Sequence, residues 1–308
     1  MRILCLCAGA VGGYFGARLI EAGADVTFLV RPARRKLLDE RGLRVESCHG
    51  NFEGRVRTVL PDELQQPFDV VLLACKAYDL SDAMTAIAPA MGPHSAVLPV
   101  LNGILHLDVL NGAFGAGRVL GGSAKIAAAL DGGAIRHLND WNYITFGEQD
   151  GTMSERVRAL QAAFGDGPVV ARAVPDIMQV MWGKLVHLAT VAGMTSAMRA
   201  NIGEIVRTEE GADLLMEFLE RNAEIARREG FPTEPALMED YRAMVSNAAS
   251  AQTASMLRDI ENKGAIEAAH VIGYMLTKAR AHGIDATLHR MVFAHLQAYE
   301  QRRAGHRF

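Results

Sequence analysis

The first thirty residues of the chain consist of a short apolar run, a longer amphipathic stretch and a second short apolar run. The runs Ile3–Cys7 and Val26–Val30 have the length and composition of buried strands. Between them, Tyr14–Ala22 has the apolar spacing of a helix. This order of strand, turn, helix and strand predicts the opening unit of a parallel α/β sheet.

A glycine-rich turn joins the first predicted strand to the helix. Gly9 allows a phosphate to approach the backbone closely, and Gly12 allows the helix to pack tightly on the strand. Cys7 stands where the usual pattern has its first glycine, so the turn is C-x-G-x-x-G. We predict that Gly9, Ala10, Val11 and Gly12 bind the pyrophosphate of a dinucleotide at the helix N-terminus.

A secretory signal peptide is the alternative interpretation of the same stretch, because Arg2 precedes an apolar run and small residues. The pattern continues, however, into an amphipathic helix with Arg18 and Glu21 and then into a second strand. That continuation favours a folded unit that the mature protein retains.

Cysteine usage, charge and hydropathy exclude several classes of protein. The four cysteines are Cys5, Cys7, Cys48 and Cys75, and they show neither C-x-x-C nor disulfide spacing. This pattern predicts reduced thiols, a cytoplasmic protein and no metal site. A net charge of −3 argues against a nucleic-acid surface. The chain has no uninterrupted apolar stretch of about twenty residues, so we expect no membrane span.

The length of 308 residues, half of them apolar, predicts two domains. Short β-branched runs alternate with helical stretches through Gly147, whereas the chain from Pro175 onward has helical periodicity. We therefore predict an α/β fold: an N-terminal Rossmann doubly wound sheet over residues 1–173, followed by an all-α C-terminal domain over residues 174–308.

Further strands are expected at Phe68–Cys75 and Ser95–Leu101, although Pro99 cannot donate to a ladder. Gly121–Ala129 and Trp141–Phe146 are expected to complete the same sheet, the latter as an antiparallel strand.

Two polar residues follow predicted strands at their carboxyl ends, where open α/β sheets bind ligands. Lys76 follows one strand directly, and Asn102 with Gly103 follows the next. The lysine can neutralise an anionic group, and the asparagine amide can orient a ribose or a nicotinamide. Alternatively, Lys76 is a solvated loop residue and Asn102 belongs to an ordinary turn.

The end of the second strand indicates which nicotinamide cofactor is used. An NAD enzyme normally has an acidic residue there, but this chain has Arg31, followed by Arg34 and Arg35. Guanidinium groups suit a 2′-phosphate, which predicts NADPH. The alternative is that these arginines only solvate the start of a helix.

A solitary lysine is the main catalytic candidate in the second half of the chain. Lys184 is the only formal charge in the apolar segment Ile177–Met198, which predicts a core helix. Desolvation lowers the pKa of a lysine, so Lys184 is a candidate general acid. Leu188 and Ala192 follow on the same helical face and predict an apolar pocket. The alternative is a lysine that snorkels to the surface.

A partner for Lys184 is expected in the segment from residue 255 to residue 267. Gly264 is a predicted helix stop, after which Glu267 begins a new helix. Glu267 could hold the lysine or accept a substrate hydroxyl hydrogen, and Ser255 could bind a substrate carboxylate. The alternative is that Glu267 is a solvated helix residue.

These motifs together resemble the ketopantoate reductase family over essentially the whole chain. They are the glycine turn, Arg31, C-K-A at Cys75–Ala77, L-N-G at Leu101–Gly103, W-G-K-L at Trp182–Leu185 and S-M-L-R-D-I-E followed by Glu267. The resemblance implies reduction of the 2-oxo group of ketopantoate with NADPH, commonly for pantothenate synthesis, in a cleft between the two domains. It further implies that Lys184 is the general acid, that Glu267 holds the substrate hydroxyl or the lysine, and that Ser255 binds the substrate. Lys76 and Asn102 would contact cofactor and substrate, and Arg31 the 2′-phosphate.

The chain departs from that family pattern at the residues that follow the lysine. Leu188 and Ala192 stand where the family usually has asparagines that grip the substrate, and Ala269 replaces a usual acidic residue. Another 2-oxo acid is therefore an alternative substrate, and a non-catalytic NADPH sensor is a third possibility. An apolar stripe near Leu215 could support a homodimer, although such stripes more often belong to an internal core.

Overall fold

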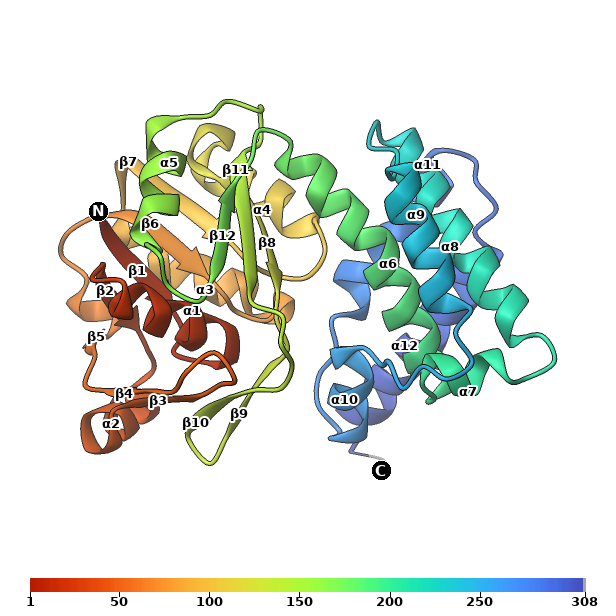
Figure 1. Ribbon diagram of the computed structural model, residues 1–308, viewed down its shortest axis with the longest axis horizontal. Coiled ribbons are helices and arrows are strands. Elements are labelled where there is room, and N and C mark those ends of the chain that lie inside the picture. The colour runs from red at the N-terminus through yellow and green to blue at the C-terminus, as the bar shows by residue number, and fades with distance from the viewer. Residues whose placement is uncertain (307–308) are drawn as a thin grey trace. The chain divides into compact units, whose positions relative to one another are not determined.

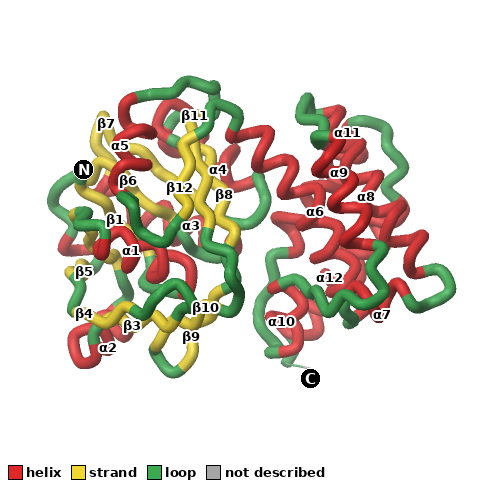
Figure 2. Tube along the Cα trace, in the orientation of Figure 1, coloured by secondary structure: helices red, strands yellow, loops and turns green. Residues whose placement is uncertain are grey.

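The structure, a computed structural model, describes residues 1–306 and divides into two compact units (Figure 1). One unit comprises Met1–Leu101 and His106–Ile177, and the other comprises Asn102–Leu105 and the chain from Met178 onward. Figure 2 shows strands in the first unit, whereas helices and loops make up the second. The expected fold class, a Rossmann sheet followed by a helical domain, is confirmed.

A parallel five-stranded sheet in the order β5-β2-β1-β6-β7 forms the centre of the first unit. Its strands are β1 (Arg2–Leu6), β2 (Asp25–Leu29), β5 (Arg57–Val59), β6 (Phe68–Leu73) and β7 (Met91–Pro99). The helices of this unit are α1 (Ala10–Glu21), α2 (Pro32–Arg41), α3 (Leu80–Ile87), α4 (Leu105–Phe114) and α5 (Glu155–Ala163). The strand order reverses between β1 and β6, so the ligand-binding switch point lies at their carboxyl ends.

The apolar runs of the sequence explain the burial of this sheet. Ile3, Leu4 and Cys5 of β1 are fully buried, because neighbouring strands and helices cover them. Gly16 of α1 lets the helix lie close to β2, since a Cβ there would come within 2.5 Å of the Phe28 ring. The same Cβ would lie 3.1 Å from the Cys5 Sγ of β1, so α1 packs closely on both strands. This packing fixes the turn that joins β1 to α1.

The prediction that Gly121–Ala129 and Trp141–Phe146 complete the main sheet is wrong. Strands β8 (Leu120–Lys125), β11 (Tyr143–Glu148) and β12 (Val170–Ala173) form a separate sheet in the order β12-β11-β8. Pro99 has no N–H to donate to a ladder, and Gly122 packs so closely on the Pro99 carbonyl that a Cβ would collide with it. Strand β8 therefore packs closely on β7 without joining its ladder, and only an isolated parallel bridge, between Val97 and Val119, links the two sheets there. The expected antiparallel direction of β11 against β8 is confirmed.

A small third sheet joins distant parts of the first unit. Its order is β4-β3-β10-β9, and its strands are β3 (Leu43–Glu46), β4 (Phe52–Gly54), β9 (Ala128–Asp131) and β10 (Ala134–His137). Strands β3 and β10 are parallel, with Arg136 opposite Glu46. The segments that follow these two strands therefore leave the sheet side by side, at the carboxyl ends of β3 and β10.

The second unit is helical. Its helices are α6 (Ile177–Met198), α7 (Ile202–Val206), α8 (Gly211–Arg228), α9 (Pro235–Val245), α10 (Ser255–Glu261), a π-helix (Ala269–Gly273), α11 (Tyr274–Ala281) and α12 (Thr287–Ala304). The expected core helix is confirmed as α6: Trp182 stacks on Phe231, and Gly193 packs against Phe218 and Ile272. Among the described residues, no helix combines the length and apolar character needed to cross a membrane.

Candidate functional site

The turn between β1 and α1 leaves the N-terminus of α1 open. Gly9 is the N-cap, and the first helical bond of α1 runs from the Gly13 N–H to the Gly9 carbonyl at 2.8 Å. The N–H groups of the first helical residues therefore have no partner within the helix. A Cβ on Gly9 would meet no atom within 4 Å, so the backbone is accessible there. These features fit the pyrophosphate of a dinucleotide.

Gly12 sets the position of this helix N-terminus. A Cβ on Gly12 would lie 2.5 Å from the Cys7 carbonyl oxygen and 3.1 Å from the Cβ of Ala74. Cys7 follows β1 and Ala74 follows β6, so the glycine allows α1 to begin directly beside the carboxyl ends of both strands. The turn therefore lies at the switch point of the main sheet.

Cys7 adopts the left-handed backbone conformation for which glycine is normally needed. Its φ is +72°, and its N–H donates to the Leu29 carbonyl at 3.0 Å. A non-glycine residue in this region costs roughly 1–2 kcal/mol. Burial raises the pKa of the Cys7 thiol, and the positive charge of Arg31 partly opposes this effect. Cys7 therefore replaces the first glycine of the turn with a strained backbone conformation, and burial disfavours the thiolate form of its side chain.

The three arginines that follow β2 have different surroundings. Arg34 donates to the carbonyl of Ala8 at 3.0 Å and to that of Gly133 at 3.2 Å. Arg35 forms a bidentate bond with Glu63 at 2.6 and 2.7 Å. Arg31 is the exposed N-cap of α2, and its side chain makes no hydrogen bond or ion pair within residues 1–306. Arg34 and Arg35 thus bond to the protein itself, although the buried Nη2 of Arg34 has no hydrogen-bond partner, and Arg31 is the exposed arginine of the three without such bonds.

Lys76 and Asn102 follow strand ends, as predicted. Lys76 lies three residues beyond β6, is half-buried and precedes a short 3₁₀ turn, where its carbonyl accepts the Asp79 N–H at 2.9 Å. Asn102 follows β7 and belongs to the short segment that packs with the helical unit. Gly103 has φ +84°, and a Cβ there would lie 2.9 Å from the His270 carbonyl oxygen.

Lys184 lies in the middle of α6 and is half-buried. Its neighbours along the helix are apolar as expected: Leu188 is half-buried and Ala192 is buried. His187 stacks on Tyr241 with ring centroids 4.8 Å apart, and burial raises the pKa of Tyr241 to about 12. The lysine therefore stands on a helix whose surroundings are largely apolar.

Glu267 is buried, with only 7% of its surface exposed, directly before the last helical segments. Its backbone carbonyl accepts the N–H groups of His270 and Val271, each at 3.1 Å, where the π-helix begins. Burial lowers the pKa of His270, and the Glu267 carboxylate partly opposes this. The interpretation of Glu267 as a solvated helix residue is therefore wrong, because its carboxylate lies in the interior.

Helix α10 begins at the half-buried Ser255 and ends close to the predicted stop. The left-handed residue is Lys263, with φ +58°, rather than Gly264. The N–H of Gly264 then closes the helix by donating to the Asp259 carbonyl at 2.7 Å. The chain turns there and leads to Glu267 within three residues, as expected.

Two features, one in each unit, could not be predicted from the sequence. The π-helix Ala269–Gly273 begins two residues after Glu267, and such turns are frequent at functional sites. No local residue pattern signals it. The bonds of Arg34 to Ala8 and Gly133 were also unforeseen, because Gly133 is 99 residues away in the sequence.

Comparison with known proteins gives matches that run through both units. The family pattern described as Ketopantoate reductase PanE/ApbA matches residues 3–151, and its C-terminal counterpart matches residues 176–300. The "Uncharacterized oxidoreductase YkpB" of Bacillus subtilis is 36% identical over 301 residues, which cover 97% of this chain and 99% of the relative.

Two solved structures share the fold. The 2-dehydropantoate 2-reductase of Geobacter metallireducens superimposes with a TM-score of 0.87 at 26% identity, covering 97% of this chain and 99% of its own. A D-mandelate dehydrogenase solved with NADH and anilino(oxo)acetate gives a TM-score of 0.86 at 20% identity, covering 99% of this chain and all of its own. The fold of this chain is thus shared with a 2-dehydropantoate 2-reductase and with a D-mandelate dehydrogenase.

Proposed function

Because the chain belongs to the ketopantoate reductase family, whose named members are oxidoreductases, we propose that it reduces a 2-oxo acid to a 2-hydroxy acid with NADPH. The observation that carries this proposal is the open N-terminus of α1 behind Gly9, at the switch point of a parallel sheet. The first candidate substrate is 2-dehydropantoate (ketopantoate), whose reduction gives pantoate for pantothenate synthesis.

The first unit supplies the cofactor-binding residues in this proposal. The backbone from Gly9 to Gly12 binds the pyrophosphate, and Arg31 binds the 2′-phosphate that distinguishes NADPH from NADH. Arg31 supports this preference because it is exposed at the end of β2, where an acidic residue would favour NADH. Lys76 and Asn102 contact the cofactor and the substrate.

The second unit supplies the acid chemistry in this proposal. When bound, the reduced nicotinamide supplies a hydride to the 2-oxo carbon. Lys184 then donates a proton from Nζ to the oxygen of the forming alcohol, a task that suits an ammonium in largely apolar surroundings. Glu267 holds either the lysine or a substrate hydroxyl, and Ser255 binds the substrate. The burial of Glu267 supports such a role, because a carboxylate is rarely buried without a partner.

A second candidate substrate is a 2-oxo acid with an apolar side chain. Leu188 and Ala192 favour it, because they present only apolar atoms at the positions four and eight residues after Lys184. A polar substrate group left buried and unpaired there would cost about 1–3 kcal/mol.

A substrate panel monitored by NADPH oxidation tests both candidates. We expect turnover with at least one 2-oxo acid among ketopantoate, the branched aliphatic 2-oxo acids and phenylglyoxylate. The highest kcat/KM for ketopantoate supports the first candidate, and the highest value for an apolar acid supports the second. Tight NADPH binding without turnover of any acid would contradict the proposed activity and favour a cofactor sensor.

A further inference from the structure

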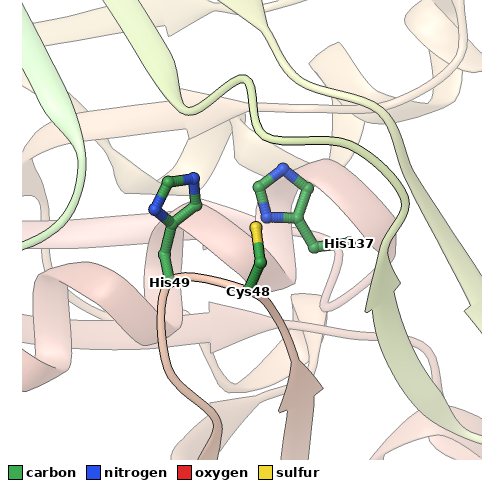
Figure 3. A group of neighbouring side chains, drawn as sticks. All are labelled: Cys48, His49 and His137. Carbon is green, nitrogen blue, oxygen red and sulfur yellow. The ribbon is translucent and has the colours of Figure 1, made fainter.

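A cysteine and two histidines gather at the edge of the small sheet in the first unit. Cys48 and His49 lie in the turn after β3, and His137 is the last residue of β10. One ligand atom from each, the Cys48 Sγ and one ring nitrogen of each histidine, lies within 4.8 Å of the others. Figure 3 shows Cys48 and His49 rising from one loop, with the His137 ring reaching toward them from the neighbouring strand.

From this geometry we propose that Cys48, His49 and His137 form a binding site for a divalent transition-metal ion, with Zn²⁺ as the best fit. Thiolate and imidazole are the ligands that Zn²⁺ prefers, and a set of three leaves a fourth tetrahedral position for water. The spacing of the cysteines along the sequence predicted no metal site. The proposal is independent of the reductase activity, since none of its residues has been placed in the cofactor or substrate machinery.

The pairing of the strands explains why these residues meet. Strands β3 and β10 are parallel, and Glu46 lies opposite Arg136. One step further along this register, Ser47 lies beside His137, and its Oγ is 2.9 Å from the Nδ1 of His137. Cys48 and His49 follow at once, so backbone register brings the three ligands together.

The hydrogen bonds of His137 favour ligation through Nδ1. Its Nε2 is 2.8 Å from the Trp141 carbonyl oxygen, which can only accept, so Nε2 carries the hydrogen. Nδ1 therefore has the free electron pair and accepts from the Ser47 hydroxyl. A metal ion would displace this hydroxyl and keep the Nε2 bond, which is the usual outer contact of a metal-bound histidine.

The other two proposed ligands, His49 and Cys48, form hydrogen bonds with backbone carbonyls of the segment that follows β10. The Nε2 of His49 is 2.9 Å from the Asp140 carbonyl oxygen, and the Cys48 thiol donates to the Asn139 carbonyl at 3.5 Å. In a tetrahedral zinc site the ligand atoms are roughly 3.3–3.8 Å apart, given Zn–N and Zn–S bonds of about 2.1 and 2.3 Å. The ligands must therefore close in by about 1 Å. Cys48 is exposed, so its side chain is free to rotate inward.

The charge balance around the site is suitable for a cation. The nearby Arg18 is paired with Glu21 at 2.6 Å and donates to the Gly50 carbonyl at 2.6 Å. Its positive charge is thus largely compensated, and ionisation of Cys48 would add a negative charge to the site. Zinc binding would release the Cys48 proton to solvent, and no oxidation or reduction is involved.

Cobalt titration of the purified, chelator-treated protein tests the site, because Co²⁺ bound to a thiolate absorbs through sulfur-to-metal charge transfer. We expect one equivalent of Co²⁺ to produce this absorption and one equivalent of Zn²⁺ to abolish it. Cys48→Ser should lose the charge-transfer band, and His49→Gln or His137→Gln should weaken binding by at least about tenfold. His94→Gln, which changes an exposed histidine on β7, is the matched control and should bind as the parent does.

Two results would overturn the proposal: no saturable Co²⁺ or Zn²⁺ binding, or binding that Cys48→Ser and His137→Gln leave unchanged. Because His137 also links two loops, the thermal unfolding of each metal-free variant is measured in parallel. A folded Cys48→Ser protein that no longer binds the metal supports the site. As a second measurement, one equivalent of Zn²⁺ should protect one fast-reacting thiol, which is absent in Cys48→Ser.

Discussion

The Nε of Arg34 donates a hydrogen bond to the backbone carbonyl of Ala8 at 3.0 Å. Ala8 lies inside the glycine turn, and Arg34 lies in the first turn of α2, so the bond ties the second helix of the unit to the glycine turn. Arg31, three residues earlier, is exposed instead. The two arginines at the start of α2 thus differ: Arg34 supports the glycine turn, and Arg31 faces solvent, where we propose that it binds a 2′-phosphate.

Alanine substitution of these two arginines separates the two tasks. Arg31→Ala should weaken NADPH binding by roughly ten- to a hundredfold and leave NADH binding nearly unchanged, because one charge-assisted contact contributes about 1.5–3 kcal/mol. Arg34→Ala should weaken both cofactors alike and lower the unfolding free energy by about 1–3 kcal/mol. Calorimetric titration with each cofactor measures the difference. An equal loss for NADH in Arg31→Ala would remove Arg31 from 2′-phosphate recognition.

The two fingerprint glycines should respond oppositely to alanine. Gly9 has φ −88°, and its Cβ would meet no atom, so Gly9→Ala should fold with unchanged or slightly raised stability. Its methyl group would occupy the space of the pyrophosphate and weaken NADPH binding by about tenfold or more. Gly12→Ala should destabilise the fold by about 1–3 kcal/mol, because its Cβ would press on the Cys7 carbonyl. Denaturant unfolding and cofactor titration on both variants check this pair.

Cys7 is expected to tolerate glycine but not valine. Cys7→Gly relieves the left-handed strain and loses a small buried side chain, so its unfolding free energy should stay within about 1 kcal/mol of the parent value. Cys7→Val places a β-branched side chain at φ +72° and should cost about 1–3 kcal/mol. Urea unfolding of the two variants gives the comparison. Equal stability of the valine and glycine variants would show that this conformation is not strained.

Lys184→Ala should reduce turnover by about 10² to 10⁴, because the alcohol oxygen would lose its proton donor. Binding of NADPH should remain nearly intact, since Lys184 lies outside the glycine turn. Lys36→Ala is a suitable control, because Lys36 is an exposed lysine of α2. Steady-state kinetics with the best substrate of the panel, together with cofactor titration, checks the prediction. Unchanged kcat in Lys184→Ala would exclude the general-acid role.

His289 should make the stability of the helical unit fall in mild acid. The ring is buried, its Nε2 is 3.0 Å from the Asn222 Oδ1, and burial lowers its pKa to about 4. Between pH 6.5 and 4 the unfolded chain binds a proton that the folded protein does not. The contribution of the His289 pKa shift to the unfolding free energy is therefore fully present above pH 6.5, and about 3 kcal/mol is lost as the pH drops to 4. Urea unfolding across this range should give a flatter profile for His289→Gln. A profile as steep as that of the parent would exclude His289 as the cause.

The sequence by itself predicts whatever depends on neighbouring residues along the chain. The run Ile3–Cys7 followed by Gly9 and Gly12 is enough to place the first strand, turn and helix, because periodicity and glycine positions act locally. The isolated charge of Lys184 in an apolar segment likewise predicted a core helix over the observed range. The burial of Glu267 did not follow in the same way, because burial depends on the elements that pack around a residue.

Tertiary structure alone decided the features that join distant segments. It set β8 in a sheet of its own, with Gly122 packed on Pro99, and it turned Arg34 onto Ala8 and Gly133. It also placed His137 beside a turn 90 residues earlier. Local propensity sets the conformation of each segment, but strand register and packing, which depend on the whole unit, determine which side chains meet. For that reason the glycine turn between β1 and α1 could be predicted from a few adjacent residues, whereas the proposed metal site could not.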